Sequence, residues 1–505
     1  MKAVLFSIIW FFGISLFSQN EVDAIRFSQE NIGSTARSFA VGGAFGAVGA
    51  DPSCAAINPA GMAKYRSSKL YISTAFYNAK NKTTFLGNNL TDNKFNFNLP
   101  NLGLVINIPG EDYTEKNPKG FVNFIVGFNV NRKNNFHNRI IFDGVNNVNS
   151  ITQDWVERAN REGLSPADMS AYSLEHLAYA AAAIDPDTTS SFPRYLSAYG
   201  KTPILVNQSG IVQSRGALND YNFSVAANYR HLIQGGISIG FKSIRYIESY
   251  SFIEQDLKTG NIKDIRSLTL DKDFSTKGRG LDAKIGILVS PSEFFRFGYA
   301  YHSPTFYNLT DSYTYTINSV FDYGARDVFN DDRKNTIATT LPTVYRYKIT
   351  TPSRHVFSAA MLNKELGFMS IDIEYVNYAG ASLWAKDYKF IPENAKIKSN
   401  YQSVVNIRFG VELIQDIFRF RAGYARNPSP SKSRGAVSDL HIHANNTYTV
   451  GFGIKGESYS FDIAFITASY NNSYYPYSLQ DNKQPLTSNK VNNSSLILTA
   501  GFNID

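Results

Sequence analysis

Composition and charge exclude several classes of protein. The chain has 505 residues, of which 18% are charged and 14% are aromatic, with 31 Tyr and 37 Phe but only 3 Trp. This charged fraction is low for a soluble protein, and the abundant Tyr and Phe favour β-strands. The single cysteine, Cys54, excludes an intramolecular disulfide and so a scaffold held by disulfides. The net charge is +8, but no run of Lys and Arg forms a basic stripe, so we expect contact with anionic lipid and no nucleic-acid partner.

The N-terminus predicts export. Lys2 precedes an apolar run from Ala3 to Phe17, and Ser18 is a small residue suited to cleavage. About 15 apolar residues are typical of a secretory signal and too few for a membrane-spanning helix, so residues 1–18 are predicted as a signal peptide. No later segment reaches 18 consecutive apolar residues. The exported chain is therefore expected to be either soluble or a transmembrane β-barrel.

The next segment has an unusual composition. From Thr35 to Ala63 the sequence is rich in Gly and Ala, is almost uncharged, and shows neither strand alternation nor a sustained helical stripe. Small residues let a backbone pack closely against a surface, and glycine permits irregular turns. Asn58 followed by Pro59 marks one such turn. We therefore predict that residues 19–68 form a hatch that plugs a barrel too wide to be filled by its own side chains.

From Lys69 onward, alternation with a period of two dominates. The stretch VVNIRFGVEL places Val405, Ile407 and Phe409 on one face, and Asn406 and Arg408 on the other. FRFRAGYAR and FDIAFITASY repeat this scheme. A sandwich also alternates, but a membrane barrel does so over segments of about ten residues, with apolar side chains facing lipid and polar ones facing the lumen. The predicted fold is therefore all-β, with residues 69–505 forming a transmembrane antiparallel barrel.

The number and spacing of the strands support this prediction. About fourteen strands are expected, and an even number keeps both ends of a closed barrel on one side. They are predicted near 69–80, 93–108, 120–132, 219–231, 234–251, 276–291, 294–303, 353–363, 366–378, 400–413, 417–426, 444–455, 458–470 and 492–504. Tight links follow strands 4, 6, 8, 10 and 12, and long links follow the odd-numbered strands from the third. Short periplasmic turns and long extracellular loops are typical of outer-membrane barrels.

The long loops are predicted to be extracellular. They cover residues 133–218, 252–275, 304–352, 379–399, 427–443 and 471–491. Within the first of them, a helix is predicted after Ser165 as N-cap and Pro166 at the first helical position, with Leu174 and Leu177 on its apolar face. Such a helix could cap the barrel or form part of a landing groove for a substrate.

The hatch sequence resembles a known family. Residues 33–63, GSTARSFAVGGAFGAVGADPSCAAINPAGMA, are similar to the N-terminal hatch of the FadL/TodX outer-membrane transporters of hydrophobic compounds, including long-chain fatty acids. Later segments, such as GFMSIDIEYVNYAGASL, resemble the branch associated with Bacteroidetes. The matching hatch positions are Ala36, Arg37, Gly42, Gly43, Ala44, Asn58, Pro59, Ala60 and Gly61. The resemblance implies a fourteen-stranded barrel in which loops capture a ligand, a lumenal pocket binds it, and a hatch rearrangement releases it without ATP.

Charged residues on the predicted lumen face are the candidate ligand or ion-pair groups. Arg37 is expected to pair with a wall carboxylate, because a buried arginine needs a partner. The candidates on the wall are Arg408, Glu412, Arg419, Arg421, Asp372, Glu374 and Asp462. If Ile414 pairs with Ile417, Glu412 and Arg419 face each other across two strands. Arg408 and Arg421 are the basic groups expected to meet an anionic ligand head.

No enzyme is predicted. The sequence contains neither an HExxH nor a GxSxG motif, so no catalytic residue, metal site or cofactor is expected, although His441 and His443 could share a strand face. The favoured function is passive transport of hydrophobic molecules, long-chain fatty acids or aromatic hydrocarbons, across the outer membrane of a Gram-negative cell. A general diffusion porin and a surface adhesin or antigen without transport remain alternatives. Expected partners are a hydrophobic ligand, outer-membrane lipid or lipopolysaccharide, and the barrel-assembly machinery, with the chain acting as a monomer.

Overall fold

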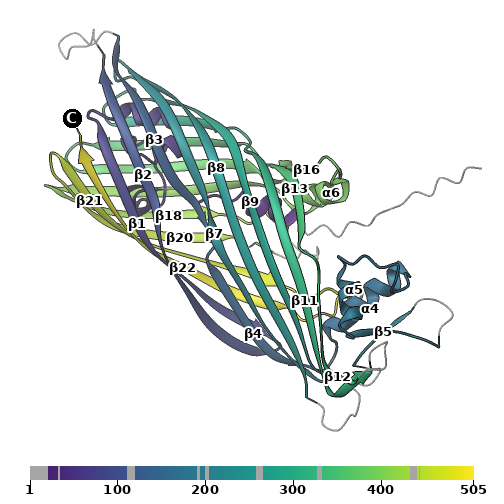
Figure 1. Ribbon diagram of the computed structural model, residues 1–505. Helices are drawn as coiled ribbons and strands as arrows, with labels where there is room; N and C mark the ends of the chain where they lie inside the picture. The colour runs from purple at the N-terminus through teal and green to yellow at the C-terminus, as the bar shows by residue number, and fades with distance from the viewer. Residues whose placement is uncertain are drawn as a thin grey trace, which may run out of the picture.

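One antiparallel sheet closes into a long barrel around a helical plug (Figure 1). The computed structural model describes residues 21–31, 34–110, 120–189, 194–199, 204–257, 265–326, 332–432, 441–442 and 444–504. The last strand pairs with the first from Lys69↔Asn503 to Thr84↔Ser488, so the described sheet closes on itself. Six of its twenty strands continue a neighbour across a short interruption, which leaves a wall fourteen strands wide, as predicted.

The bounds of the wall strands follow the order of the chain. They are β1 (Lys69–Phe85), β2 (Asn88–Pro109), β3 (Phe121–Asn135) continued by β4 (Asn138–Asn146), β7 (Val206–Tyr229), β8 (Ile233–Asp256), β9 (Ile265–Val289), β10 (Phe295–His302) continued by β11 (Phe306–Arg326), β12 (Asp332–Thr339) continued by β13 (Thr343–Thr350) and β14 (Arg354–Asn363), β15 (Gly367–Asn377) continued by β16 (Ser382–Trp384), β17 (Ser403–Gln415), β18 (Phe418–Asn427), β19 (His441–Ile442) continued by β20 (Asn445–Lys455), β21 (Tyr459–Tyr474) and β22 (Thr487–Asn503).

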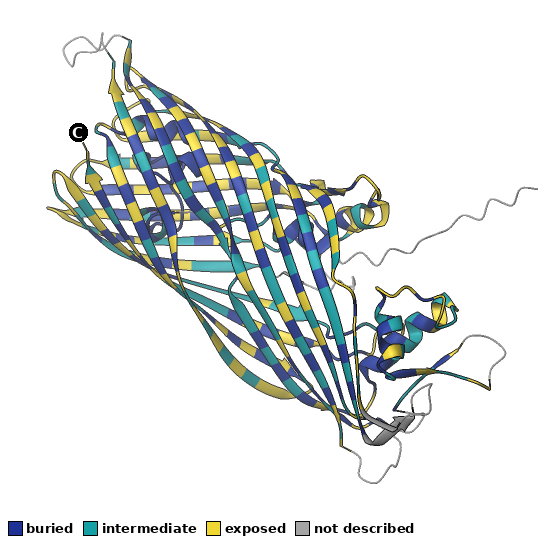
Figure 2. Cartoon of the chain, in the orientation of Figure 1, coloured by how far each residue is buried: buried dark blue, intermediate teal, exposed yellow. Residues whose placement is uncertain are grey.

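The alternation read from the sequence is the alternation between the two faces of the wall. Along β8, for example, Ile237, Ile239 and Phe241 are exposed, whereas Ser238 and Lys242 are buried (Figure 2). Large apolar side chains point outward and polar side chains point into the lumen, which is the inside-out pattern of a membrane barrel. Together with the closed sheet, this pattern gives the protein the architecture of a bacterial outer-membrane protein, as the sequence predicted.

Several segments predicted as loops are strand. β7, β8, β9 and β11 run far beyond their predicted ends, so most of the predicted loops 252–275 and 304–352 lies in the sheet. Their polar composition is typical of loops, because beyond the lipid both faces of a strand can be polar and the apolar alternation weakens. β1 and β2 are likewise joined by a tight turn at Leu86 and Gly87, both with positive φ. The tight links at the opposite end of the barrel are as predicted.

The hatch precedes β1, which begins at Lys69. Its described elements are α1 (Glu21–Arg26), α2 (Ala36–Ala40), α3 (Cys54–Ile57) and the 3-10 helix η1 (Pro59–Lys64). η1 packs against β3, β7, β8 and β9, and α2 against β18, β20, β21 and β22, so the hatch contacts opposite sides of the wall. The predicted signal peptide, 1–18, lies outside the described residues. Among the residues that are described, no helix is long and apolar enough to cross a membrane.

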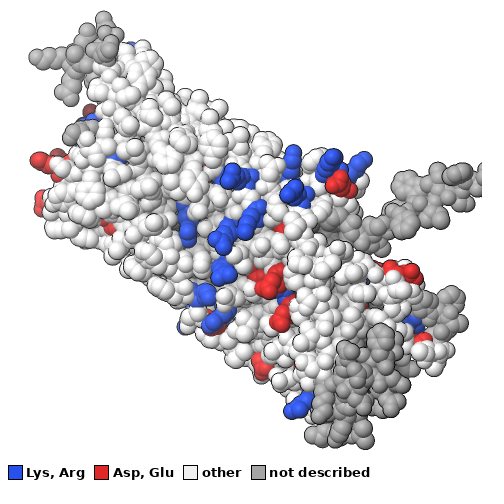
Figure 3. Space-filling model, in the orientation of Figure 1, with Lys and Arg blue, Asp and Glu red and all other residues white. Residues whose placement is uncertain are grey.

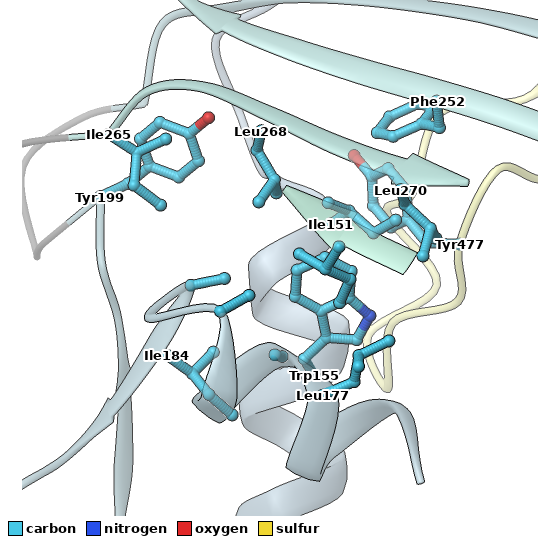
Figure 4. Close-up of a cluster of buried hydrophobic side chains, with 14 of the residues drawn as sticks. Ile151, Trp155, Leu177, Ile184, Tyr199, Phe252, Ile265, Leu268, Leu270 and Tyr477 are labelled. Atoms are coloured by element: carbon cyan, nitrogen blue, oxygen red, sulfur yellow. The ribbon is translucent and has the colours of Figure 1, made fainter. Parts of the chain in front are cut away.

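A small cap covers part of the end of the barrel opposite the tight turns. It contains α4 (Ile151–Glu162), α5 (Leu174–Ala180) and the hairpin of β5 (Ile184–Pro186) and β6 (Tyr195–Ser197). Trp155 of α4 is fully buried among Ile151, Leu177 and the wall residue Leu268 (Figure 4). The 3-10 turn η2 (Tyr378–Gly380) lies between β15 and β16, and a further described helix, α6 (Ile391–Asn400), follows β16.

The predicted start of the helix after Ser165 is wrong. Ser165 accepts no cap bond. Instead its hydroxyl donates to the side chain of Asp168 in a turn, and α5 begins only after Ser173, whose side chain accepts the N–H of His176. Ser173 therefore supplies the N-cap. The apolar positions Leu174 and Leu177 do lie in the helix, as predicted.

Candidate functional site

The hatch sits close to the end of the barrel that carries the tight turns. Wall glycines let it approach: eight inward-facing glycines contact it so closely that an added Cβ would lie 2.0–2.8 Å from hatch atoms. They are Gly103, Gly127, Gly236, Gly286, Gly298, Gly410, Gly423 and Gly451. At Gly423, for example, a Cβ would lie 2.1 Å from the nitrogen of Gly42. Small residues on both partners therefore let two backbones pack almost directly together.

Wall side chains hold the hatch through its backbone. The carboxylate of Asp372 accepts the N–H groups of Phe45 and Gly46, each at 3.0 Å, and the hydroxyl of Ser370 donates to the carbonyl of Ala44 at 2.6 Å. On the opposite wall, Thr449 accepts the N–H of Gly42 at 3.1 Å. The N–H of Ala36 donates to Thr499 at 2.7 Å. These bonds satisfy backbone groups that no regular element pairs, which a buried irregular segment requires.

The two sequence motifs of the hatch form its two tight turns. Gly42 and Gly43 have φ values of 66° and 77°, which favour glycine. The side chain of Asn58 accepts the N–H of Ala60 and so caps η1, while its amide donates to the carbonyl of Gly46 at 2.8 Å. Pro59 lies at the start of that helix, and the N–H of Gly61 donates to the carbonyl of Asn58 at 2.9 Å. The Asn-Pro-Ala-Gly turn thus joins the two halves of the hatch.

Arg37, which is partly exposed, and three buried wall residues form an ion-pair chain. The Nε atom of Arg37 lies 3.4 Å from Glu412, one of the wall acids expected to pair with it. Glu412 also pairs with Arg421 at 2.6 Å, and Arg421 with Asp462 at 2.6 Å. The predicted pairing of Glu412 with Arg419 is wrong, because the turn is centred on Asp416 and Ile417, and the register sets Glu412 opposite Arg421. Arg419 instead donates to the carbonyls of Asp416 and Phe418.

Between the hatch and the cap lies a cavity of about 710 Å³. Its lining comes from the hatch (Phe39, Gly42), the wall and the cap (Ile151, Trp155). Tyrosine is the most frequent aromatic residue of the lining: Tyr77, Tyr246, Tyr250, Tyr315, Tyr378, Tyr470, Tyr474, Tyr475 and Tyr477. Aromatic rings with hydroxyl groups at their edges offer apolar area and a few polar contacts, and this volume is in the range of small-molecule sites.

Two wall arginines form part of the cavity lining. Arg408 and Arg354 both line it, and both donate to the buried carboxylate of Glu374 at 2.8 Å. The Nη1 atom of Arg408 is buried without a hydrogen-bond partner among the described residues. Once the side chain turns toward the cavity, an unpaired guanidinium N–H can donate to a polar or anionic group. Arg421, the other basic group expected to meet a ligand, does not line this cavity, because its guanidinium lies in the ion-pair chain near the hatch.

The start of the hatch is tied to the wall by a second set of charges. Glu30, which also lines the cavity, accepts from the ammonium of Lys242 at 2.6 Å, and Lys242 in turn lies 3.2 Å from Asp282. Burial raises the pKa of Glu30, but the ammonium groups of Lys242 and Lys133 outweigh it and hold that pKa well below its usual range. No sequence motif marks this cluster, although Lys242 and Asp282 are charged residues at inward positions of strands with an alternating pattern, which is a signal for lumen residues.

Among the residues that the structure describes, neither a metal site nor a reactive thiol is found. The described residues contain no group of three or more His, Cys, Asp or Glu side chains that could hold a metal ion, and His443 lies outside them. Cys54 is buried beside Gly61 in the hatch, and burial raises the pKa of its thiol, so the thiolate is disfavoured.

Comparison with solved structures identifies the fold. A Pseudomonas aeruginosa FadL homologue matches with a TM-score of 0.53 and 12% identity over 95% of this chain and 100% of its own. The toluene transporter TodX of P. putida gives 0.51 and 9% over 94% and 99%, and the toluene transporter TbuX of Ralstonia pickettii 0.50 and 13% over 94% and 100%. No family model and no curated protein matches the chain. The chain therefore has the fold of the FadL/TodX transporters, as its hatch sequence predicted.

Proposed function

We propose that this barrel is a FadL-type transporter that carries hydrophobic molecules passively across the outer membrane. The observation that supports this most directly is the tyrosine-rich cavity held between the hatch and the cap. A general diffusion porin needs an open aqueous lumen. Here the hatch is bonded to the wall on several sides. A surface adhesin has no use for an internal cavity of about 710 Å³.

The polar end of the cavity favours a ligand with one anionic or polar head. Arg408 lies there with a buried, unpaired N–H, while Trp155 and Ile151 of the cap supply apolar lining elsewhere, beside Asp154 and Arg158. A long-chain fatty acid has this polarity, with a carboxylate at one end of an apolar chain. An aromatic hydrocarbon would occupy the apolar part alone. A fatty acid is therefore the ligand class that uses more of the lining.

Two features support a release step. The hatch is held largely by hydrogen bonds between wall side chains and its backbone, and by close glycine contacts, all of which a movement of the hatch would break. In addition, three neighbouring wall strands are interrupted at one level, between β10 and β11, β13 and β14, and β15 and β16. Few regular ladder bonds cross the wall there; one is the N–H of Thr351 to the carbonyl of Thr305 at 3.0 Å. A ligand leaving the cavity sideways toward the bilayer would cross this part of the wall.

In the first experiment, bound lipids are extracted from the purified protein and identified by mass spectrometry. In parallel, the ion conductance of the protein is measured in a planar bilayer. A stoichiometric apolar molecule and a closed channel support transport by binding. An empty protein that conducts small ions freely would indicate a porin.

A second experiment tests the ligand head. The variant Arg408→Gln should weaken binding of a fatty acid roughly tenfold, the loss of about one hydrogen bond to a charged group, and leave binding of a neutral hydrocarbon unchanged. Arg419→Gln is the matched control, because Arg419 lies at a tight turn and does not line the cavity. Equal loss for both ligands, or no loss for the fatty acid, would contradict the assignment of Arg408.

A further inference from the structure

A row of basic side chains crosses the outer surface of the barrel where its apolar band ends. Figure 3 shows it as a blue diagonal between an uncharged wall and a group of acidic side chains. The strands β8, β9, β11 and β13 lie next to one another in this part of the wall. The pairing register of these strands shows which outward residues lie at the same height on the wall. It therefore gives the position of the basic row relative to the apolar band.

The apolar band ends at one cross-strand level. Tyr221, Phe241, Leu281 and Phe306 are directly opposite one another on β7, β8, β9 and β11, and all four are exposed. From Ile233 to Phe241, outward positions of β8 carry large apolar residues or glycine. Eight steps of about 3.3 Å at a tilt of about 40° give an apolar height of roughly 20 Å, close to that of a barrel's lipid-facing band. The tight turns lie at the other end of this band, so this level faces the outer leaflet.

At the next two cross-strand levels beyond the apolar band, several outward residues are basic. The first level contains Arg279 and Lys348, and Lys348 lies over the exposed ring of Trp384 at 5.0 Å. The second contains Arg245, Lys277 and Arg346. All five basic residues are exposed, and none has an ion-pair partner among the described residues.

The pairing itself argues against a structural role. Arg245 and Lys277 are directly opposite each other on β8 and β9, and like charges in such a pair destabilise a sheet. A second like-charge pair, Lys82 and Lys490, occurs on the outward faces of β1 and β22. It too lies beyond exposed apolar residues, Phe76 and Leu496, which are opposite each other. A bound anion would remove the repulsion at both places.

We propose that this row, Arg245, Lys277, Arg279, Arg346 and Lys348, binds the phosphate groups of a phosphorylated glycolipid of the outer leaflet. The position fits, because such a lipid places its phosphates at the boundary between acyl chains and water. The charge fits, because basic residues at a membrane surface attract anionic head groups. Arginine and lysine also donate several hydrogen bonds to phosphate oxygens, and Trp384 occupies the interfacial position that tryptophan favours in membrane proteins.

The test compares the double variant Arg245→Gln/Lys277→Gln with wild type and with a control, Arg230→Gln/Lys364→Gln. The control loses the same charge from two exposed tight turns at the opposite end of the barrel. Each protein is purified in detergent and incubated with diphosphoryl lipid A, with its dephosphorylated form, or with phosphatidylglycerol. Binding is measured by native mass spectrometry and by the shift in Tm.

We expect wild type and control to bind diphosphoryl lipid A and gain Tm, and the row variant to bind it roughly 30-fold more weakly. Without lipid, the row variant should melt at or above the wild-type Tm, because a like-charge pair is removed. This second reading separates lost binding from lost folding. Two results would overturn the proposal. The first is that the row variant binds diphosphoryl lipid A as tightly as the control does. The second is that wild type binds the dephosphorylated form or phosphatidylglycerol as tightly as diphosphoryl lipid A. Transport of a hydrophobic ligand is measured separately and need not change.

Discussion

The carboxylate of Asp372 on β15 lies 3.0 Å from the backbone nitrogen of Gly46 in the hatch. It also accepts the N–H of Phe45, so one wall side chain holds two consecutive peptide groups of the plug. Because the contact is made to the backbone, the hatch sequence can stay small and apolar and still be fixed to a polar lumen. Opening of the hatch must break these bonds.

Removal of this carboxylate should loosen the hatch. In Asp372→Ala, two buried N–H groups lose a charged acceptor, at a cost of about 3 kcal/mol to hatch docking. We expect higher single-channel conductance with an unchanged barrel, measured in planar bilayers and by heat-modifiable gel migration. The conductance of Asp372→Asn should lie between those of wild type and Asp372→Ala, because its amide oxygen can still accept a hydrogen bond. Asp271→Ala, an exposed site on β9, is the control, and equal conductance of Asp372→Ala and this control would contradict the prediction.

Gly42 should tolerate no side chain. Its φ is 66°, and an added Cβ would lie 2.9 Å from backbone atoms of Tyr424. Gly87 also has a positive φ, 88°, but nothing lies within 4 Å of its Cβ position. Gly87→Ala therefore measures the cost of the backbone conformation alone, roughly 1–2 kcal/mol. Gly42→Ala adds a steric clash and should unseat the hatch, which limited proteolysis of residues 34–64 would detect. Similar proteolysis of both variants would show that the close approach is unimportant.

Acid should release the start of the hatch. The pKa of Glu30 is held well below 4.5 in the folded protein, so the unfolded segment binds more protons below pH 4.5. The stabilisation is therefore complete above that pH and is lost as pH falls through the folded pKa. After correction for the intrinsic exchange rate, the protection of residues 21–31 against hydrogen exchange should decrease in this acid range in wild type. In Glu30→Gln the protection should already be lower at pH 7 and change little with acid, and an acid response identical to that of wild type would exclude Glu30 as its source.

The cap should respond to pH in the opposite sense. Glu254 lies at the extracellular end of β8, beyond the apolar band, and accepts from Ser150, from the N–H of Ile151 and from Gln208. Burial raises its pKa to about 7. The folded state then binds more protons than the unfolded state between pH 4.5 and 7, so docking of α4 weakens as pH rises through this window, by up to about 3 kcal/mol.

Hydrogen exchange of residues 151–162 at pH 5 and pH 8 tests this, after correction for the intrinsic exchange rate. Wild type should be better protected at pH 5, and Glu254→Gln should be equally protected at both, because its amide stays neutral. Glu365→Gln, in an exposed tight turn, should behave like wild type. A pH effect that persists in Glu254→Gln would place its origin elsewhere.

The sequence by itself determined the class of fold and the two turns of the hatch. Strand alternation is a local consequence of backbone geometry, so residues such as Ile407 and Arg408 reveal their faces without any knowledge of their partners. The tight turns, the parity of the links and the Asn58-Pro59 turn are equally local. The parts of the strands beyond the lipid could not be predicted in this way. Outward positions need to be apolar only where they face lipid, so the alternation that identifies a strand ends at the edge of the membrane.

Only the tertiary structure decided which charges meet. A shift of one residue at the turn after Gln415 changes the partner of Glu412 from Arg419 to Arg421, and no pattern in the sequence specifies that register. The meeting of Glu30 with Lys242 depends on the hatch entering the lumen, and that of Arg245 with Lys277 depends on the register between β8 and β9. The cavity likewise exists only once hatch, wall and cap are assembled, because each contributes part of its lining and none encloses it alone.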